Sequence, residues 1–147
     1  MITVRPIQAA DFDQWSALYD GYAEFYKVHM DDQIKGNLWS WLMDDKHEVE
    51  GLLALVDDTP CGFAHVRRMP SPLRGMDIGF LDDLFVSPVS RGKQVGKALF
   101  GELEAVAKAR GWPKIRWITA DDNYRARGLY DQLSNKTMWN TYEMEIS

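Results

Sequence analysis

Two adjacent carboxylates, Asp82 and Asp83, lie shortly before a basic turn that contains glycines, Arg91–Lys97. Carboxylates can hold an amine or accept a proton from it, whereas the turn suits an anion. An amphipathic stretch follows the turn, and if it forms a helix, its first N–H groups are unpaired and carry partial positive charge. Since glycines let a phosphate approach the backbone closely, the turn is a candidate pyrophosphate site. It has neither the P-loop ending nor the Rossmann glycine pattern.

The elements that must position these residues alternate between apolar strands and amphipathic helices. Alternation predicts strands, and spacings of three and four residues predict helices. The expected strands are Ile2–Arg5, Val49–Val56, Cys61–Met69, Ile78–Val86, Ile115–Thr119 and Trp139–Ile146. The expected helices are Asp11–Lys27, Asp31–Met43, Lys93–Arg110 and Asn123–Leu133, with Asp11 and Asn123 as N-caps. The 147 residues contain no linker or internal repeat and predict one domain, 1–147.

The turn resembles the acetyl-CoA-binding loop of the GNAT family of N-acetyltransferases. That loop reads Arg/Gln-x-x-Gly-x-Gly/Ala after a strand with an apolar-x-Val ending, and here it reads Arg91-Gly92-Lys93-Gln94-Val95-Gly96. The one departure is Gln94, which stands where the first glycine of the motif is expected. A second segment, Asn123–Tyr130, is similar to the family's Asn-x-x-Ala-x-x-Leu/Phe-Tyr signature. Both motifs follow predicted strands in the expected order, and the resemblance covers nearly the whole chain.

The resemblance implies an α/β, single-domain GNAT fold. Its central sheet is mixed but mostly antiparallel, is flanked by helices and splays apart between the fourth and fifth strands, where the cofactor lies. Within the family, the Asp82–Val86 stretch and the aromatic first helix are most similar to a histone- and polyamine-type subgroup. The chain has Ser134–Thr137 where many members carry a Gly-Phe turn, so we expect a different substrate wall there.

The resemblance also implies which residues hold acetyl-CoA. Backbone groups at the end of the fourth strand are expected to pair with the pantetheine arm. Backbone groups of the turn are expected to bind the pyrophosphate, and the last helix completes the site. The expected set is Leu84, Phe85, Val86, Arg91, Gly92, Lys93, Gln94, Val95, Gly96, Lys97, Asn123, Ala126 and Tyr130. The three histidines have no ligand spacing and there is one cysteine, so no metal site is expected.

Acetyl transfer to an amine needs a group that holds or deprotonates the amine, an oxyanion donor and an acid for the leaving thiolate. The resemblance places Tyr130 beside the sulfur, and its ordinary pKa of about 10 suits a general acid. Asp82 and Asp83 are the candidates for the amine, with Asp82 expected to meet the substrate. Since neighbours on a strand face opposite sides, only one should face the cleft unless a bulge intervenes. Tyr22 and Tyr26 are candidate substrate contacts, although their helical spacing favours core packing.

The composition restricts the partners. The net charge of −5 argues against a general nucleic-acid binder, and no run of residues is long and apolar enough for a membrane span. The single Cys61 excludes an internal disulfide and the first residues lack a signal-peptide pattern, so we expect a cytoplasmic protein.

These features favour an enzyme that moves an acetyl group from acetyl-CoA to a primary amine by direct attack in a ternary complex. A small amine, a polyamine or an amino acid is the expected acceptor. Two alternatives stay open: an acetyltransferase of protein lysines or N-termini, and a non-catalytic regulatory module that only binds acyl-CoA, for which Gln94 leaves room. Exposed aromatic or strand-edge surface would also permit a homodimer.

Overall fold

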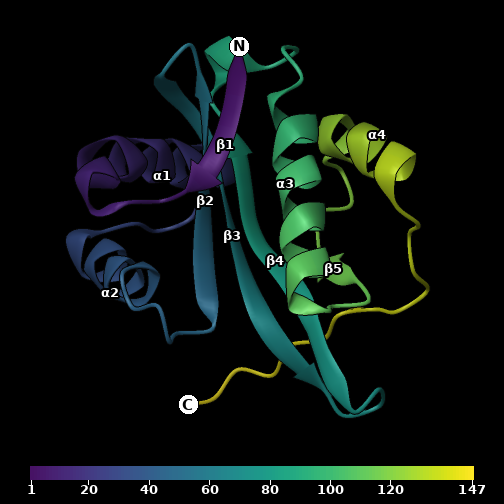
Figure 1. Cartoon of the computed structure of the whole chain (residues 1–147). Coiled ribbons are helices and arrows are strands. Elements are labelled where there is room, and N and C mark those ends of the chain that lie inside the picture. Colours follow the sequence, from purple (N-terminus) through teal and green to yellow (C-terminus); the bar gives the residue numbers. More distant parts are fainter.

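The computed structural model describes residues 1–147 and has a five-stranded sheet at its centre (Figure 1). The strands are β1 (Ile2–Pro6), β2 (Val49–Val56), β3 (Thr59–Ser71), β4 (Met76–Val86) and β5 (Ile115–Trp117). They lie side by side in sequence order, antiparallel from β1 to β4, with β5 parallel to β4. The prediction of a mixed, mostly antiparallel sheet is confirmed.

Helices cover both faces of the sheet. They are α1 (Phe12–Tyr26), α2 (Asp32–Leu42), α3 (Val95–Arg110) and α4 (Tyr124–Leu133), and the short 3-10 turns η1 (Ala9–Asp11) and η2 (Pro88–Ser90) precede α1 and α3. In Figure 1, α1 and α2 lie on one side of the sheet, and α3 lies on the other side next to α4. None of the helices combines the length and the apolar character that a membrane span requires.

Each face of the sheet has its own hydrophobic core, and β4 contributes to both. Trp15 and Tyr19 are four residues apart, so they share the buried stripe of α1. The core under α1 and α2 includes Leu53, Phe63 and Phe85, and the core under α3 includes Cys61, Ala64, Val66, Leu81, Leu99 and Leu103. The strand that carries the two candidate carboxylates is therefore packed firmly from both sides.

The pairing of β4 with β5 ends early. Their parallel ladder runs from Gly79–Ile115 to Leu81–Trp117, and beyond it β4 continues to Val86 without a neighbour on that side. The Ser87 N–H donates to a carbonyl of β3, and because hydrogen-bonded pairs alternate along an antiparallel ladder, Leu84 and Val86 direct their backbone groups away from β3. The predicted opening between the fourth and fifth strands is present, with backbone groups of β4 facing into it.

A β-bulge interrupts β4 at Asp82. His65 of β3 lies opposite Asp83, and the next residue, Val66, lies opposite Leu81, so Asp82 has no partner on β3. The extra residue changes the phase of the strand. Leu81 packs toward α3, whereas Asp83 faces α1.

The expected final strand, Trp139–Ile146, is absent. Residues 134–147 form neither helix nor strand, and in Figure 1 the segment runs from α4 past the end of the sheet. Its sequence suits a strand, but a strand also needs a neighbour that completes its hydrogen bonds. No strand of the chain pairs with it, and its large apolar side chains stay at least 80% exposed: Met138, Trp139, Tyr142, Met144 and Ile146.

Two expected helix caps are wrong as well. Asp11 precedes α1 but has helical backbone angles, and its carboxylate accepts hydrogen bonds from Arg5 (2.8 Å) and from the Gln8 N–H (2.7 Å). Asn123 precedes α4, yet its side chain makes no bond to the helix and donates instead to the hydroxyl of Tyr26 (3.3 Å). In both cases a different partner competes successfully with the helix N-terminus for a short polar side chain.

Candidate active site

A cavity of about 270 Å³ lies at the opening beside β4. It is lined by the end of β4, the turn before α3, one side of α4, and Phe25 and Tyr26 from the last turn of α1. Of the residues expected to hold acetyl-CoA, all except Lys93 line this cavity. Ser90 and Leu129 line it too; Leu129 occupies the Leu/Phe position of the second signature, whereas no motif position marks Ser90.

The turn before α3 presents a row of backbone donors. The N–H groups of residues 92–97 make no backbone hydrogen bond, and the first bond of α3 joins the Ala98 N–H to the Gln94 carbonyl. Unpaired donors at a helix N-terminus attract an anion, and the side chains of Arg91 and Lys97 in the cavity wall add positive charge. These residues fit the pyrophosphate of acetyl-CoA.

Gln94 has the left-handed backbone conformation that favours glycine, with φ 70° and ψ 16°. That conformation costs a residue with a Cβ atom roughly 1–2 kcal/mol, which explains why the family motif has glycine at this position. The backbone of the turn adopts this left-handed conformation although Gln94 stands in place of the glycine of the motif. Because the left-handed residue interrupts the helix, α3 begins at Val95 and not at Lys93 as the pattern predicts.

We expect Gln94→Gly to stabilise the protein by roughly 0.5–1 kcal/mol, because the removed strain exceeds the chain entropy that glycine adds to the unfolded state. Urea unfolding measures the change. Gln33→Gly in α2 is the matched control and should destabilise the protein, since Gln33 lies within an ordinary helix. Equal losses of stability in both variants would show that Gln94 is not strained.

Arg91 connects three parts of this site. Its Nε donates to the Val86 carbonyl at 3.1 Å, and its guanidinium lies 4.6 Å from the centre of the Phe25 ring. These contacts join the turn to the end of β4 and to α1, so the three parts are held in one arrangement.

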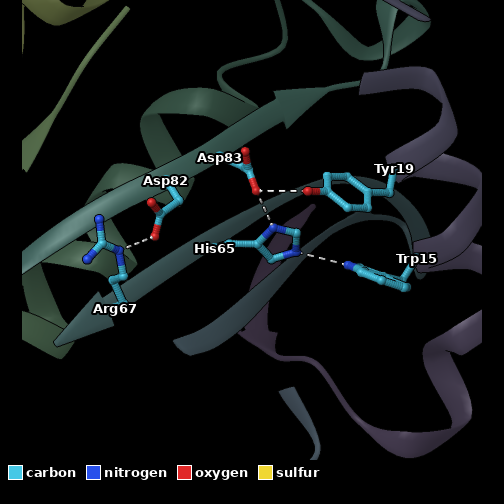
Figure 2. Close-up of polar contacts among 6 residues, drawn as sticks. All are labelled: Trp15, Tyr19, His65, Arg67, Asp82 and Asp83. Carbon is cyan, nitrogen blue, oxygen red and sulfur yellow. Dashed lines mark hydrogen bonds and ion pairs between the residues drawn. The ribbon is translucent and has the colours of Figure 1, made fainter. Parts of the chain in front are cut away.

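Asp82 and Asp83 lie beside the cavity and do not form part of its wall. They project from the same face of the sheet as His65 and Arg67 of β3 (Figure 2). Nε of Arg67 donates to Asp82 at 2.9 Å, and Nδ1 of His65 lies 2.8 Å from Asp83. The bulge therefore produces the exception to strict alternation, and both carboxylates share one face.

The pKa values of the two carboxyls shift in opposite directions. Burial raises the pKa of Asp82, and the guanidinium of Arg67 offsets only part of that effect. Burial also disfavours the charged form of Asp83, but the hydrogen bonds from His65 and from the nearby tyrosine hydroxyls outweigh it and lower the pKa. Asp83 is thus the more firmly ionised group, and Asp82 is the better proton acceptor.

Tyr130 lines the cavity from α4, and its ring packs edge-on against Phe100 and Trp117. Burial, with a smaller contribution from Tyr26, raises the pKa of Tyr130 to about 12. The hydroxyl is therefore protonated at neutral pH, which is the state that a general acid requires.

Of the two tyrosines expected to touch the substrate, Tyr26 lines the cavity and Tyr22 does not. The Tyr26 hydroxyl accepts the hydrogen bond from Asn123 and so joins α1 to α4. Tyr22 packs between Tyr19 and Tyr26, and Asp83 contributes to the rise of its pKa after burial, so it lies near the carboxylates.

Sequence reasoning missed Arg67 as a site residue. The signal that could have found it is its position two residues after His65, on the strand that pairs with the carboxylate strand. That spacing puts both side chains on one face, but only the register shows that they meet Asp82 and Asp83.

Comparisons with known proteins identify the family. The acetyltransferase (GNAT) family model matches residues 13–134. D-amino-acid N-acetyltransferase HPA3 of Saccharomyces cerevisiae is 28% identical over 138 residues, which cover 92% of this chain and 86% of the yeast protein. Thialysine N-epsilon-acetyltransferase of Caenorhabditis elegans is 24% identical, over 99% of this chain and 91% of the nematode protein.

A solved structure agrees with this match. The ribosomal-protein-alanine N-acetyltransferase from Brucella melitensis biovar Abortus 2308 is similar over 99% of both chains, with a TM-score of 0.83 and 25% identity. The family match covers both motifs, the splayed sheet and the residues around the cavity. The chain therefore belongs to the acetyltransferase (GNAT) family and is an acetyltransferase that uses acetyl-CoA.

Proposed function

We propose that this enzyme acetylates the primary amine of a small molecule by direct attack in a ternary complex, and that an amino acid is the favoured acceptor. The observation that carries the proposal is the charge pattern on the face shared by β3 and β4. Asp82 and Asp83 suit an ammonium, and Arg67 beside them suits a carboxylate. The yeast and nematode relatives are named for amino acids, D-amino acids in yeast and thialysine in the nematode.

The charge pattern also separates acceptor classes. A polyamine carries ammonium groups alone and would face Arg67 with a like charge, whereas an amino acid offers both signs at short distance. We therefore favour amino acids over the polyamines and histone lysines of the subgroup that the first helix and Asp82–Val86 resemble.

We assign a residue of this chain to each step of the proposed reaction. Acetyl-CoA supplies the activated acyl group. Asp83 holds the ammonium of the acceptor. Asp82 accepts the proton of this ammonium through water, because a carboxylate is a far weaker base than an amine and direct transfer is unfavourable. The N–H of Leu84, which faces the opening, stabilises the oxyanion, and the hydroxyl of Tyr130 protonates the departing thiolate.

The experiment that tests this function measures acetyl-CoA binding by calorimetry and then release of the CoA thiol with a panel of amines. The panel holds amino acids, polyamines, a lysine peptide and a peptide with N-terminal alanine. We expect amine-dependent release that is fastest with amino acids. Release with peptides only would favour a protein acetyltransferase, the activity for which the Brucella neighbour is named. Binding without any release would favour the regulatory module.

We expect Arg67→Gln to raise the KM for an amino acid about 10- to 100-fold, since a charge-assisted hydrogen bond to the carboxylate is lost. The KM for the matching amine without a carboxylate should change little. Arg68→Gln is the control, because the adjacent Arg68 pairs with Asp77 at 3.5 Å and not with Asp82 or Asp83. If Arg67→Gln affected both substrates equally, the acceptor carboxylate would not bind at Arg67.

We also propose that the enzyme works in the cytoplasm, without a nucleic-acid or membrane partner. The net charge of −5 and the free, buried Cys61 support this location and choice of partners.

We further propose a homodimer formed through residues 138–146. This segment carries five of the most exposed apolar side chains, and β5 ends the sheet with one edge unpaired. Burying these side chains in two copies would remove roughly 1,600–1,800 Å² from water, the size of a stable interface. Pairing with β5 of a second copy would also give the segment the strand conformation that its sequence favours.

Truncation after Thr137 is expected to convert the dimer into a monomer, as measured by analytical ultracentrifugation. The truncated chain should keep its far-UV circular dichroism, because the removed residues are exposed and form no helix or strand. Leu73→Ser removes an exposed apolar side chain elsewhere and should leave the dimer intact. A monomeric full-length chain, or a truncated chain that still dimerises, would contradict this assembly.

A further inference from the structure

A chain of buried and partly buried hydrogen bonds runs from α1 through β3 to Asp83 (Figure 2). The indole N–H of Trp15 donates to Nε2 of His65 at 3.0 Å, and Nδ1 of His65 lies 2.8 Å from Oδ2 of Asp83. The hydroxyl of Tyr19 donates to the same oxygen at 3.2 Å. Trp15 is fully buried and His65 is 1% exposed, so water does not compete with their hydrogen bond.

The contacts with Trp15 and Asp83 together determine which nitrogen of His65 carries hydrogen. An indole N–H can only donate, so Nε2 of the imidazole must accept. The hydrogen of the neutral ring is then on Nδ1, which donates to Asp83. A proton on Nε2 would place two N–H groups against each other at 3.0 Å. The geometry therefore selects one tautomer of His65.

This tautomer determines how Asp83 is oriented. Oδ2 accepts the hydrogen bonds from both His65 and Tyr19, and the hydroxyl of Tyr22 also lies near the carboxylate, whereas no close hydrogen bond is made to Oδ1. Two donors on one oxygen fix the rotation of the carboxylate and favour its charged form. The side chain keeps 17% of its surface exposed, so Oδ1 is the oxygen left for a ligand. A fixed carboxylate oxygen favours a positively charged hydrogen-bond donor, such as an ammonium, as its ligand.

We propose that Trp15 and His65 are positioning residues for the acceptor. Trp15 locks His65 as the Nδ1–H tautomer, and His65 in turn holds Asp83 as an anion whose Oδ1 receives the acceptor's ammonium. The identity of this ligand rests on the proposed acetyl transfer, whereas the tautomer lock is a property of the protein alone. Asp82 is outside this chain of bonds, so proton transfer to Asp82 does not depend on Trp15 or His65.

A matched pair of variants tests the positioning role. The side-chain nitrogen of His65→Asn lies where Nδ1 lies and still donates to Asp83, whereas His65→Gln reaches the position of Nε2 and serves only Trp15. We expect His65→Gln to raise the KM for the amine about 10- to 100-fold, with a smaller change in kcat and an unchanged dissociation constant of acetyl-CoA. His65→Asn should recover most of that loss. Equal impairment of the two variants, or an unchanged KM in His65→Gln, would overturn the positioning role.

The lock itself is tested without turnover. Trp15→Phe removes the indole donor, and Trp39→Phe is its control, because Trp39 packs on Trp15 at 5.0 Å between ring centres without bonding to His65. Long-range ¹H–¹⁵N spectra at mildly alkaline pH should show only the Nδ1–H tautomer in the wild type and Trp39→Phe. In Trp15→Phe a minor Nε2–H fraction should be added, because only Asp83 then still favours hydrogen on Nδ1. Nε2–H in the wild type would overturn the lock even in an active enzyme. A wild type with the lock but no turnover of any amine would refute the proposed function instead.

Discussion

Tyr130→Phe is expected to lower kcat by about 10²- to 10³-fold, while the dissociation constant of acetyl-CoA changes little. Phenylalanine keeps the ring contacts with Phe100 and Trp117 but lacks the hydroxyl that protonates the departing thiolate. Initial rates of CoA release give kcat, and calorimetry gives the affinity for acetyl-CoA separately.

Tyr124→Phe is the control for this variant, since Tyr124 is on the same helix but is 74% exposed and outside the cavity. The pH dependence tests the same role. A phenol is protonated below its pKa, and the pKa of Tyr130 is raised to about 12, so wild-type kcat should not fall at alkaline pH until the pH approaches that value. Full activity of Tyr130→Phe, or an alkaline loss of kcat near the ordinary tyrosine pKa of about 10, would contradict the assignment.

Asp83→Asn is expected to lower kcat/KM for the amine by about 10²-fold or more, because a partly buried charge pair with the ammonium is lost. Asparagine has nearly the same shape, but it is neutral and cannot accept the bonds from both His65 and Tyr19 with the same strength. The measurement varies the amine at saturating acetyl-CoA.

Asp77 and Asp82, two other carboxylates of the same strand, provide the comparison variants for this result. Asp77→Asn removes a half-exposed carboxylate that pairs with Arg68, and it should leave kcat/KM unchanged. Asp82→Asn should act mainly on kcat, since the proposed role of Asp82 is proton transfer and not binding. If Asp82→Asn raised the KM for the amine and Asp83→Asn did not, the two roles would be the reverse of those proposed.

The elements of the fold could be predicted where local pattern and tertiary packing agree. The spacing of Trp15 and Tyr19 predicts the buried stripe of α1, and the apolar run Val49–Val56 coincides with β2. The unpaired donors of the turn Arg91–Lys97 could also be predicted, because its glycines and N–H groups depend on residues next to one another in the chain.

The parts that could not be predicted depend on partners far away in the sequence. The bulge at Asp82 results from the register of β4 against β3, and strict alternation predicts only one carboxylate on each face. Trp15 and His65 are 50 residues apart, and nothing local to either residue indicates their bond. Residues 139–146 have the pattern of a strand, but the pattern cannot show that the single chain offers no neighbour for it.

The most direct test of acetyl transfer by this enzyme is to follow the acetyl group itself. The protein is incubated with acetyl-CoA that carries a deuterated acetyl group and with an amino acid, and the products are analysed by mass spectrometry beside the Tyr130→Phe variant. We predict a deuterated N-acetyl amino acid and an equal amount of free CoA, both strongly reduced in the variant. Release of CoA without a labelled acceptor, or bound acetyl-CoA that labels no amine in the panel, would contradict the proposed N-acetyltransferase.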